Sequence, residues 1–295
     1  MKVSCAYEFK VIKGGYRGEK MGYISVEEDI RLYYEEYGTG DRVIMSAQVG
    51  FYPKGMQQEL ARQGFHVYCI TLRGFAPSSY VTEDYGDGWY DVFADDVVRV
   101  ADALSVDKFI YMGASHGAGV GWHLVIRHPE RVKAFAAVVP GPHSLAEGAM
   151  SYRQMLMQGI IEAPPPFDPP IDNDPARVSR REERERIISI PREVDDREKN
   201  IDYGRPLMKY GSEEKLCEVL KGIDTPTLIL GGIEDPISTP DLMIRTAKCL
   251  PHCKLVIYSN CGHNIDTDLV EELTDETIRF LDNVEKYNKV YKEPG

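Results

Sequence analysis

The stretch Phe109-Ile110-Tyr111-Met112-Gly113-Ala114-Ser115-His116-Gly117-Ala118-Gly119 decides the fold of this chain. A short apolar run enters a Gly-x-Ser-x-Gly turn, and small residues lead out of the turn into a helical pattern. Glycines on both sides of the serine let the backbone bend tightly and let the helix lie close to the strand. The sequence therefore predicts a strand, a sharp turn and a helix, with the Ser115 hydroxyl exposed at a helix N-terminus that favours developing negative charge.

The composition of the 295-residue chain predicts a globular protein with a full core, since 43% of its residues are hydrophobic. A net charge of −12 argues against a nucleic-acid partner. The sequence contains no apolar segment of signal-peptide length and no run of about 18 apolar residues. We therefore expect a cytoplasmic protein with a small-molecule substrate and no membrane partner, and we leave a homodimer open.

The cysteines predict no disulfide framework. Six of them are scattered along the chain, at Cys5, Cys69, Cys217, Cys249, Cys253 and Cys261. In a cytoplasmic chain of this length they are expected to be reduced, structural thiols. The segment from Cys249 to Cys253 also contains His252, but no second ligand cluster accompanies it, so no metal site is predicted.

Apolar runs alternate with helical patterns along most of the chain. Strands are predicted at residues 7–12, 23–26, 30–35, 43–46, 65–71, 109–113, 132–139, 227–232 and 254–258. Helices are predicted at 57–62, 90–104, from the serine turn to about 128, at 240–250 and at 270–284. This spacing is typical of βαβ units, which build a mostly parallel sheet.

The alternation stops between residues 143 and 224, where no run resembles a buried strand. This segment contains a proline cluster and a highly charged stretch, 177–205, with both signs interspersed. The charged stretch is interpreted as a solvated helical surface, with ion pairs of little individual value. The segment as a whole is compatible with a mobile cap whose inner face shapes a substrate pocket.

Four separate motifs stand in a defined order. The first is the loop Leu72-Arg73-Gly74-Phe75-Ala76-Pro77-Ser78, and the second is the turn around Ser115. The third is Gly231-Gly232-Ile233-Glu234-Asp235-Pro236-Ile237, which follows a predicted strand. The fourth is Cys261-Gly262-His263-Asn264, after the last predicted strand.

Through these motifs the chain resembles the α/β-hydrolase family, over roughly residues 22–142 and 225–284. The first motif is similar to the family's Asp-x-Arg-Gly-x-Gly-x-Ser loop, with Thr71 in place of the aspartate and Ala76 in place of the second glycine. The resemblance implies an α/β-hydrolase fold, in which helices flank a mostly parallel eight-stranded sheet and a mainly helical cap follows strand 6. It predicts a core of 1–142 and 225–295 and a cap of 143–224, with no cofactor.

The order serine, acid, histidine is the one that this fold uses for a catalytic triad. A serine hydroxyl is a poor nucleophile at neutral pH, so Ser115 needs a base, and His263 can accept its proton. A carboxylate must then fix the imidazole tautomer and stabilise the imidazolium, and Asp235 is the predicted acid. Glu234 is its nearest rival.

The oxyanion hole departs from the family's usual sequence. Backbone N–H groups must point at the developing negative charge, and we predict those of Val49 and His116. The family usually has His-Gly in the loop before the first donor, whereas this chain has Ala47-Gln48. A backbone donor does not depend on its side chain, and the amide of Gln48 could contribute a further hydrogen bond.

The substrate pocket is predicted less sharply than the triad. Aromatic residues occur in the oxyanion loop, at Phe51 and Tyr52, and before the 90–104 helix, at Tyr85, Trp89 and Tyr90. They could line a pocket for an apolar substrate or belong to the ordinary core. Gln48, Phe51 and Trp89 are taken as the candidate substrate contacts.

The predicted activity is that of a serine hydrolase that acts on a small carbonyl substrate through an acyl-enzyme. The substrate could be an ester, a lactone or a compound with a C–C bond next to a carbonyl. One alternative is a cofactor-independent ring-cleaving dioxygenase, because the Gly-x-Ser-His-Gly pattern here resembles the elbow of those enzymes. Their acid follows strand 6, where this chain has Pro140-Gly141-Pro142-His143 and no carboxylate. Another is a non-catalytic ligand-binding protein of the same fold, which the altered oxyanion loop favours.

Overall fold

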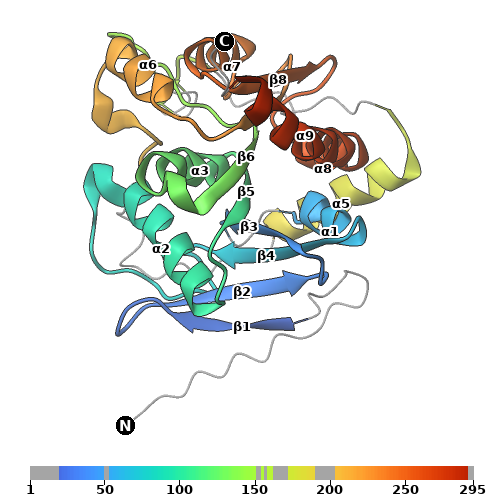
Figure 1. Cartoon of the computed structure of the whole chain (residues 1–295). Coiled ribbons are helices and arrows are strands. Elements are labelled where there is room, and N and C mark those ends of the chain that lie inside the picture. Colours follow the sequence, from blue (N-terminus) through green and yellow to red (C-terminus); the bar gives the residue numbers. More distant parts are fainter. Residues whose placement is uncertain are drawn as a thin grey trace.

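The computed structural model describes residues 20–49, 53–150, 154–155, 158–161, 172–189 and 203–291. The predicted strand at 7–12 lies outside the described residues, as do Phe51 and Tyr52. Within the described part, eight strands form a single sheet (Figure 1). They are β1 (Lys20–Ser25), β2 (Arg31–Tyr37), β3 (Arg42–Gln48), β4 (Phe65–Thr71), β5 (Phe109–Ala114), β6 (Val132–Val138), β7 (Thr227–Gly232) and β8 (Cys253–Tyr258).

The sheet has the strand order β1-β2-β4-β3-β5-β6-β7-β8. β2 is antiparallel to both of its neighbours, β1 and β4, and all the remaining pairs are parallel. The predicted α/β fold with a mostly parallel eight-stranded sheet is thereby confirmed. The carboxyl ends of the parallel strands share one edge, which is where such sheets carry their ligands.

Helices cover both faces of the sheet. They are α1 (Gly55–Arg62), α2 (Trp89–Ala103), α3 (His116–Arg127), α5 (Pro175–Ser189), α6 (Glu213–Lys221), α7 (Pro240–Cys249), α8 (Ile265–Asp268) and α9 (Val270–Tyr291), with short 3-10 turns at Gly86–Gly88, Pro129–Arg131 and Met208–Tyr210. In Figure 1, α2, α3 and α6 lie on one face, and α1, α8 and α9 lie on the other. Each face has its own cluster of buried apolar side chains.

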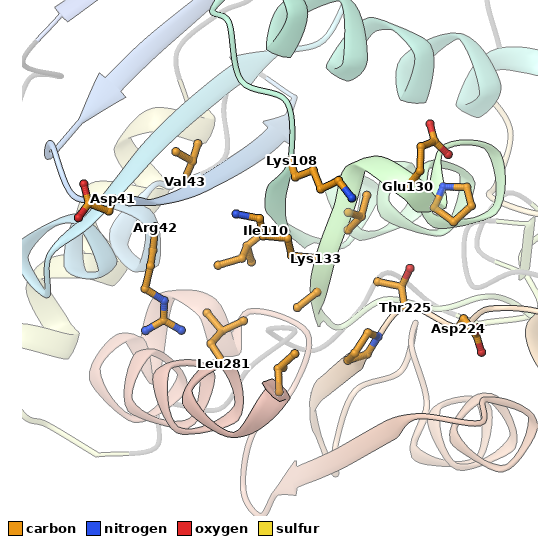
Figure 2. A pocket seen from close by; sticks show the side chains of 15 residues that line it. Asp41, Arg42, Val43, Lys108, Ile110, Glu130, Lys133, Asp224, Thr225 and Leu281 are labelled. Carbon is orange, nitrogen blue, oxygen red and sulfur yellow. The ribbon is translucent and has the colours of Figure 1, made fainter. Parts of the chain in front are cut away.

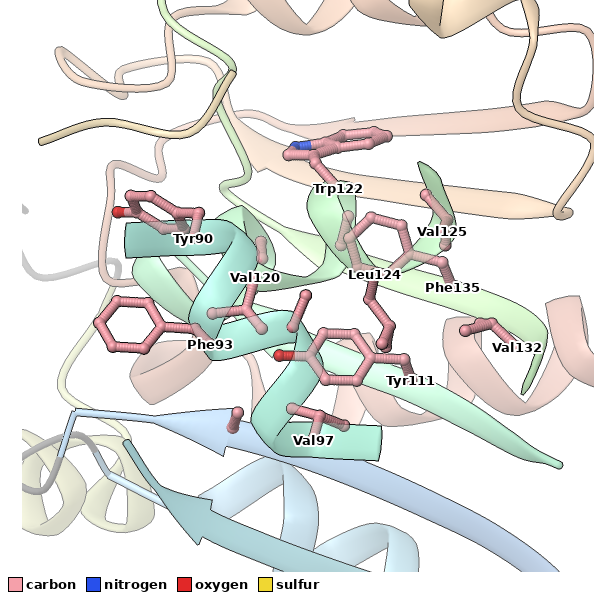
Figure 3. Packing of buried hydrophobic residues seen from close by; sticks show 14 of the residues in the cluster. Tyr90, Phe93, Val97, Tyr111, Val120, Trp122, Leu124, Val125, Val132 and Phe135 are labelled. Atoms are coloured by element: carbon pink, nitrogen blue, oxygen red, sulfur yellow. The ribbon is translucent and has the colours of Figure 1, made fainter. Parts of the chain in front are cut away.

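The larger cluster shows why α2 is a helix. Its Phe93, Val97 and Val100 recur at spacings of three and four residues and are almost completely buried. In Figure 3, Phe93 and Val97 lie in one cluster with Tyr111 of β5 and Phe135 of β6. This packing holds α2 and α3 firmly beside the strand that leads into the Ser115 turn.

The segment between β6 and β7 has two differently packed helices. α6 buries Leu216 and Leu220 in the same cluster as α2 and α3, and it contacts α7. α5 instead packs against α8, on the other face. The assignment of 143–224 as a cap stays a prediction, and within it α6 packs as part of the sheet-covering layer.

The expectation that the cysteines are reduced thiols is wrong for Cys217 and Cys249, which form a disulfide between α6 and α7. Their Cα atoms lie 5.4 Å apart, within the range that a disulfide requires. The pairing follows from helix packing that no local sequence pattern reports. Burial raises the pKa of the Cys69 and Cys253 thiols to about 12, so neither is a nucleophile at neutral pH. Among the described helices, none is long and apolar enough to cross a membrane.

Candidate active site

Ser115 lies at the apex of the turn between β5 and α3, as its sequence context predicts. Its backbone has φ 50° and ψ −112°, a conformation that L-residues rarely adopt. The N–H of Ser115 donates to the carbonyl of Val138 on β6 over 3.0 Å, and its own carbonyl accepts from the N–H of Gly119 over 2.9 Å. Hydrogen bonds from both its N–H and its carbonyl therefore hold Ser115 in this strained conformation.

Two glycines make this turn possible because there is no room for side chains. A Cβ atom on Gly113 would lie 2.3 Å from the carbonyl carbon of Gly117. A Cβ atom on Gly117 would lie 2.4 Å from the carbonyl oxygen of Ala47, on β3. The Gly-x-Ser-x-Gly pattern therefore lets α3 begin directly against β5 and β3.

The loops after β7 and β8 also lie against each other. A Cβ atom on Gly232 would be 2.1 Å from the carbonyl oxygen of Cys261, so only glycine fits there. The N–H of Glu234 donates to the same carbonyl over 2.9 Å. This close approach brings the side chains of Asp235 and His263 to one place.

The three predicted triad side chains are in hydrogen-bond contact. Nε2 of His263 lies 3.0 Å from Oγ of Ser115. Nδ1 of His263 lies 2.9 Å from Oδ2 and 3.1 Å from Oδ1 of Asp235. Because a carboxylate can only accept, Nδ1 carries the proton and Nε2 is left to accept from the serine hydroxyl.

Burial distinguishes the two candidate acids. Asp235 is 2% exposed, and its side chain also accepts from the backbone N–H groups of Ile237 and Ser238 over 2.8 and 2.9 Å. Glu234 is exposed to solvent. Of the two, Asp235 is the carboxylate that contacts the imidazole of His263.

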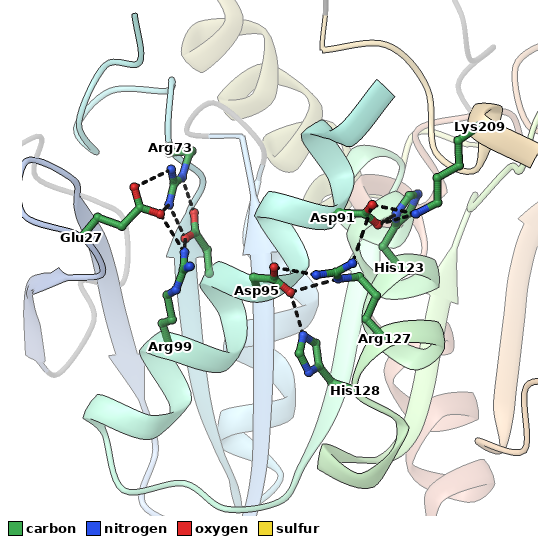
Figure 4. Close-up of polar contacts among 10 residues, drawn as sticks. Glu27, Arg73, Asp91, Asp95, Arg99, His123, Arg127, His128 and Lys209 are labelled. Carbon is green, nitrogen blue, oxygen red and sulfur yellow. Dashed lines mark hydrogen bonds and ion pairs between the residues drawn. The ribbon is translucent and has the colours of Figure 1, made fainter. Parts of the chain in front are cut away.

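The loop that resembles the family's Asp-x-Arg-Gly-x-Gly-x-Ser motif is held in place by its arginine. The Arg73 side chain is completely buried, and its guanidinium donates to both carboxylate oxygens of Asp96 over 2.6 Å. It also donates to Glu27 in the β1–β2 turn (Figure 4). Burial alone would lower the pKa of Arg73, but these hydrogen bonds outweigh it and raise the pKa. The loop is thereby tied to α2 at one side of the site.

The predicted oxyanion region lies between β3 and the start of α3. Val49 directly follows β3 and is buried, and His116 is the first residue of α3. Gln48 is 4% exposed, and its Cγ atom is 3.9 Å from the position of a Cβ on Gly117. Within the described residues, neither its amide nitrogen nor its amide oxygen has a hydrogen-bond partner. Buried polar groups are rarely left this way, and an exception calls for an explanation.

One histidine contact and one perturbed histidine were not predicted. Nδ1 of His116 lies 2.7 Å from the hydroxyl of Tyr90 on α2, with the two rings stacked. His143 lies after β6, where its burial and the positive charges of Arg205, His116 and His263 lower its pKa to about 4. His143 is therefore neutral at neutral pH. Both effects involve segments far apart in sequence, so no local pattern could have revealed them.

Trp89 has the surroundings of a core residue. It has no exposed surface, its indole N–H donates to Asp84 over 2.9 Å, and Tyr85, Phe93 and Tyr203 pack around its ring. It could touch a substrate only if these neighbours moved, so its role as a substrate contact stays a prediction. The predicted contact Phe51 lies outside the described residues.

Helix α5 contacts the loop that carries His263 through a row of arginines on one of its faces. Arg181 donates to Asp268 over 2.5 Å, and Arg184 donates over 2.6 Å to the side-chain oxygen of Asn264, which follows His263. Arg177 and Arg180 lie on the same stripe and contact α9. The stretch interpreted as a solvated surface thus has one face that binds α8 and α9. The spacing of three and four residues between these arginines is the pattern that could have predicted it.

The opposite edge of the sheet has a cavity of its own. It measures about 570 Å³ and lies at the amino ends of β3, β5, β6 and β7 (Figure 2). Its floor is apolar and its rim mixes cations such as Lys108 with acids such as Glu130. It is separate from the Ser115 site, which lies at the carboxyl ends of the strands. No group of three or more potential metal ligands occurs among the described residues.

Comparison with known proteins places the chain in a hydrolase family. A family model described as alpha/beta hydrolase fold matches residues 45–265. The chain is 26% identical to Bifunctional epoxide hydrolase 2 of Rattus norvegicus, over 88% of this chain and 55% of that protein, so it spans about half the length of that relative. It is 22% identical to the Bifunctional esterase/perhydrolase DCH of Acinetobacter calcoaceticus, over 88% of this chain and 99% of that protein.

A solved structure shows the same fold. The crystal structure of a serine hydrolase from the polyaromatic hydrocarbon-degrading bacterium Cycloclasticus zankles matches with a TM-score of 0.68 and 19% identity. The match covers 93% of this chain and 99% of that chain.

Proposed function

The chain belongs to the α/β-hydrolase fold family, and on that premise we propose that it is a serine hydrolase with Ser115 as nucleophile, His263 as base and Asp235 as acid. Its substrate is a small carbonyl compound: an ester, a lactone, or a molecule with a C–C bond next to a carbonyl. The observation that carries this proposal is the 3.0 Å contact between His263 Nε2 and Ser115 Oγ.

The first half of the reaction forms an acyl-enzyme. Ser115 Oγ attacks the substrate carbonyl carbon while its proton passes to Nε2 of His263. Asp235 accepts from Nδ1 throughout, so the imidazolium is stabilised and keeps its orientation. The tetrahedral intermediate then collapses, the bond to the leaving group breaks, and the imidazolium returns its proton to the leaving group.

The second half releases the acid product. His263, neutral again, takes a proton from water as the water oxygen attacks the acyl carbon. The second tetrahedral intermediate expels Ser115, which regains its proton from the imidazolium. No step requires an oxidant or a metal ion.

The negative charge of both intermediates would be stabilised at the start of α3. The backbone N–H groups of Val49 and His116 are the proposed donors, at a helix end that favours negative charge. The amide of Gln48 supports a role there, because a buried donor that has no partner among the described residues is available to a substrate oxygen. Removing one such donor typically costs about 3 kcal/mol of transition-state stabilisation.

The nucleophile distinguishes this proposal from the activity of the epoxide hydrolase relative. Epoxide hydrolases attack with an aspartate, whose carboxylate forms an alkyl ester, whereas the elbow here carries a serine. The dioxygenase alternative needs its acid after β6, where this chain has Pro140-Gly141-Pro142. A ligand-binding protein without activity would have no need for the assembled hydrogen bonds of Ser115, His263 and Asp235.

Pre-steady-state hydrolysis of 4-nitrophenyl acetate tests the proposal. Wild type should release about one equivalent of 4-nitrophenol per chain in a rapid burst, because acylation precedes slower hydrolysis of the acyl-enzyme. The Ser115→Ala variant, with an unchanged circular dichroism spectrum, should show no burst. If the burst survives in Ser115→Ala, another group is the nucleophile.

A further inference from the structure

His123 lies outside the proposed triad, and both of its ring nitrogens have hydrogen-bond partners. It is on α3, two turns beyond Ser115, and is 2% exposed. Its Nδ1 lies 2.7 Å from Oδ1 of Asp91 on α2. Its Nε2 accepts from the backbone N–H of Leu207 over 3.0 Å. Because Nε2 must be unprotonated to accept, Nδ1 carries the only proton and donates it to Asp91.

The residue that His123 binds belongs to a segment under strain. We call residues 203–210 the return segment; they lie within the predicted cap and lead toward α6. Leu207 has φ 64°, an unfavourable conformation for a residue with a side chain, although it is 1% exposed. Such a conformation persists only where surrounding contacts impose it. The hydrogen bond to His123 is one of those contacts.

A salt bridge holds the other end of the return segment. Lys209 lies 2.6 and 2.9 Å from the carboxylate oxygens of Asp91, the same group that accepts from His123 (Figure 4). Arg127 of α3 lies 3.8 Å from this carboxylate. One carboxylate on α2 therefore joins the histidine and the return segment.

The return segment forms part of the wall beside the nucleophile. The ring of Pro206 is 3.2 Å from the position of a Cβ on Gly119, one turn after Ser115. The hydroxyl of Tyr203 donates to the carbonyl of Gly74 over 3.4 Å. Tyr90, which contacts His116, also stacks on the ring of His123 with 5.5 Å between centroids. Moving this segment would change the surface that meets a substrate.

We propose that His123 is a positioning residue: as a neutral imidazole it fixes the return segment against α3, and protonation in acid releases that segment from the substrate site. A protonated ring would present an N–H to the N–H of Leu207, so the hydrogen bond would be lost. Only the expected effect of His123 on substrate binding rests on the proposed function; its role in fixing the return segment does not.

Burial, more than the surrounding charges, holds the pKa of His123 below its ordinary value. Burial lowers its pKa, and Lys209 and Arg127 lower it further, while the hydrogen bond to Asp91 acts in the opposite direction. The folded pKa thus lies below the ordinary value of 6.5. The contribution of His123 to stability is therefore complete above pH 6.5 and declines as the pH falls from there toward the lowered pKa.

Hydrogen–deuterium exchange of the return segment tests this proposal without any need for turnover. At pH 7.5 the peptide containing Leu207 should be protected in wild type and in His123→Gln, which keeps an acceptor and a donor. It should exchange at least tenfold faster in His123→Phe. As the pH is lowered in steps below 6.5, the protection factor of this peptide in wild type should fall toward that of His123→Phe, whereas His123→Gln should remain protected.

The chain supplies a matched control in His128, which binds Asp95 on the same pair of helices and has no contact with the return segment among the described residues. His128→Phe should leave the exchange of the 203–210 peptide unchanged. With an ester substrate, His123→Phe should raise KM at least fivefold and change kcat less than twofold, since the triad is untouched.

Equal protection in His123→Phe and wild type at pH 7.5 would overturn the proposal, and so would a wild-type protection factor that changes with pH no more than that of His123→Gln. Should His123→Phe not fold, the pH comparison between wild type and His123→Gln still decides. If the exchange results are as expected but the protein hydrolyses no ester, the role of His123 in fixing the return segment is upheld. Only the proposed function is then contradicted.

Discussion

At the scale of single residues, two neighbouring acids show how the structure assigns a role that the sequence leaves open. Glu234 and Asp235 stand side by side in the loop after β7, and either carboxylate could serve a histidine. Asp235 is buried, accepts from two backbone N–H groups and contacts Nδ1 of His263, whereas Glu234 faces solvent. Backbone hydrogen bonds favour the ionised form of a carboxyl group and fix its direction.

The substitution Asp235→Asn tests this assignment against Glu234→Gln. An amide can donate to Nδ1 and so favours the wrong imidazole tautomer, which should lower kcat by about 10³–10⁴-fold. Glu234→Gln should stay within about twofold of wild type. Steady-state ester hydrolysis by the two variants, each compared with wild type, gives the answer. The opposite ranking would make Glu234 the acid.

Gln48 leads to a prediction in which stability and activity change in opposite directions. Its two amide atoms are buried and have no partner in the described part of the chain, which costs about 1–3 kcal/mol for each group. Gln48→Met has a similar volume without the polar atoms, so it should raise the melting temperature. If the amide serves a substrate oxygen, the same change should lower kcat/KM at least tenfold.

Gln57→Met is the matched control for Gln48→Met. Gln57 is also buried, but it donates to the hydroxyl of Ser46 over 3.1 Å. This variant should lower the melting temperature, because it leaves the Ser46 hydroxyl without its donor. Thermal unfolding and ester kinetics on both variants complete the comparison. A Gln48→Met protein that is less stable and fully active would assign Gln48 a purely structural role.

At the scale of elements, α5 shows how a charged helix can be anchored on one face. Arg177, Arg180, Arg181 and Arg184 follow a helical stripe and contact α8, α9 and the residue after His263. Arg186 instead pairs with Glu183 of the same helix. Exposed pairs of the second kind contribute little, whereas a partner of a buried carboxylate contributes more.

Arg181→Met should therefore destabilise the protein, since Asp268 has 4% of its side chain exposed and loses its cation. We expect a loss of about 2 kcal/mol in the free energy of unfolding. Arg186→Met should leave the free energy of unfolding nearly unchanged, because its ion pair is exposed. Urea unfolding monitored by tryptophan fluorescence measures both values. Equal effects of the two substitutions would mean that the arginine stripe does not anchor α5.

At the scale of the whole molecule, the sequence predicts what depends on local pattern and chain order. The Ser115 turn, the described strands and the positions of Asp235 and His263 follow from apolar runs, glycines and the order of motifs. The Cys217–Cys249 disulfide and the contact of His123 with Leu207 depend on how distant helices pack. That the Gln48 amide has no hydrogen-bond partner among the described residues likewise depends on the packing of all its neighbours.

The central claim is that Ser115 is an activated nucleophile, and labelling with a fluorophosphonate probe tests it most directly. Mass spectrometry of the folded wild type should find one adduct, on the peptide that contains Ser115. Ser259→Ala, which removes an exposed serine near His263, should be labelled like wild type, and Ser115→Ala should not be labelled. A folded wild-type protein that takes up no probe, or an adduct that persists in Ser115→Ala, would contradict the account.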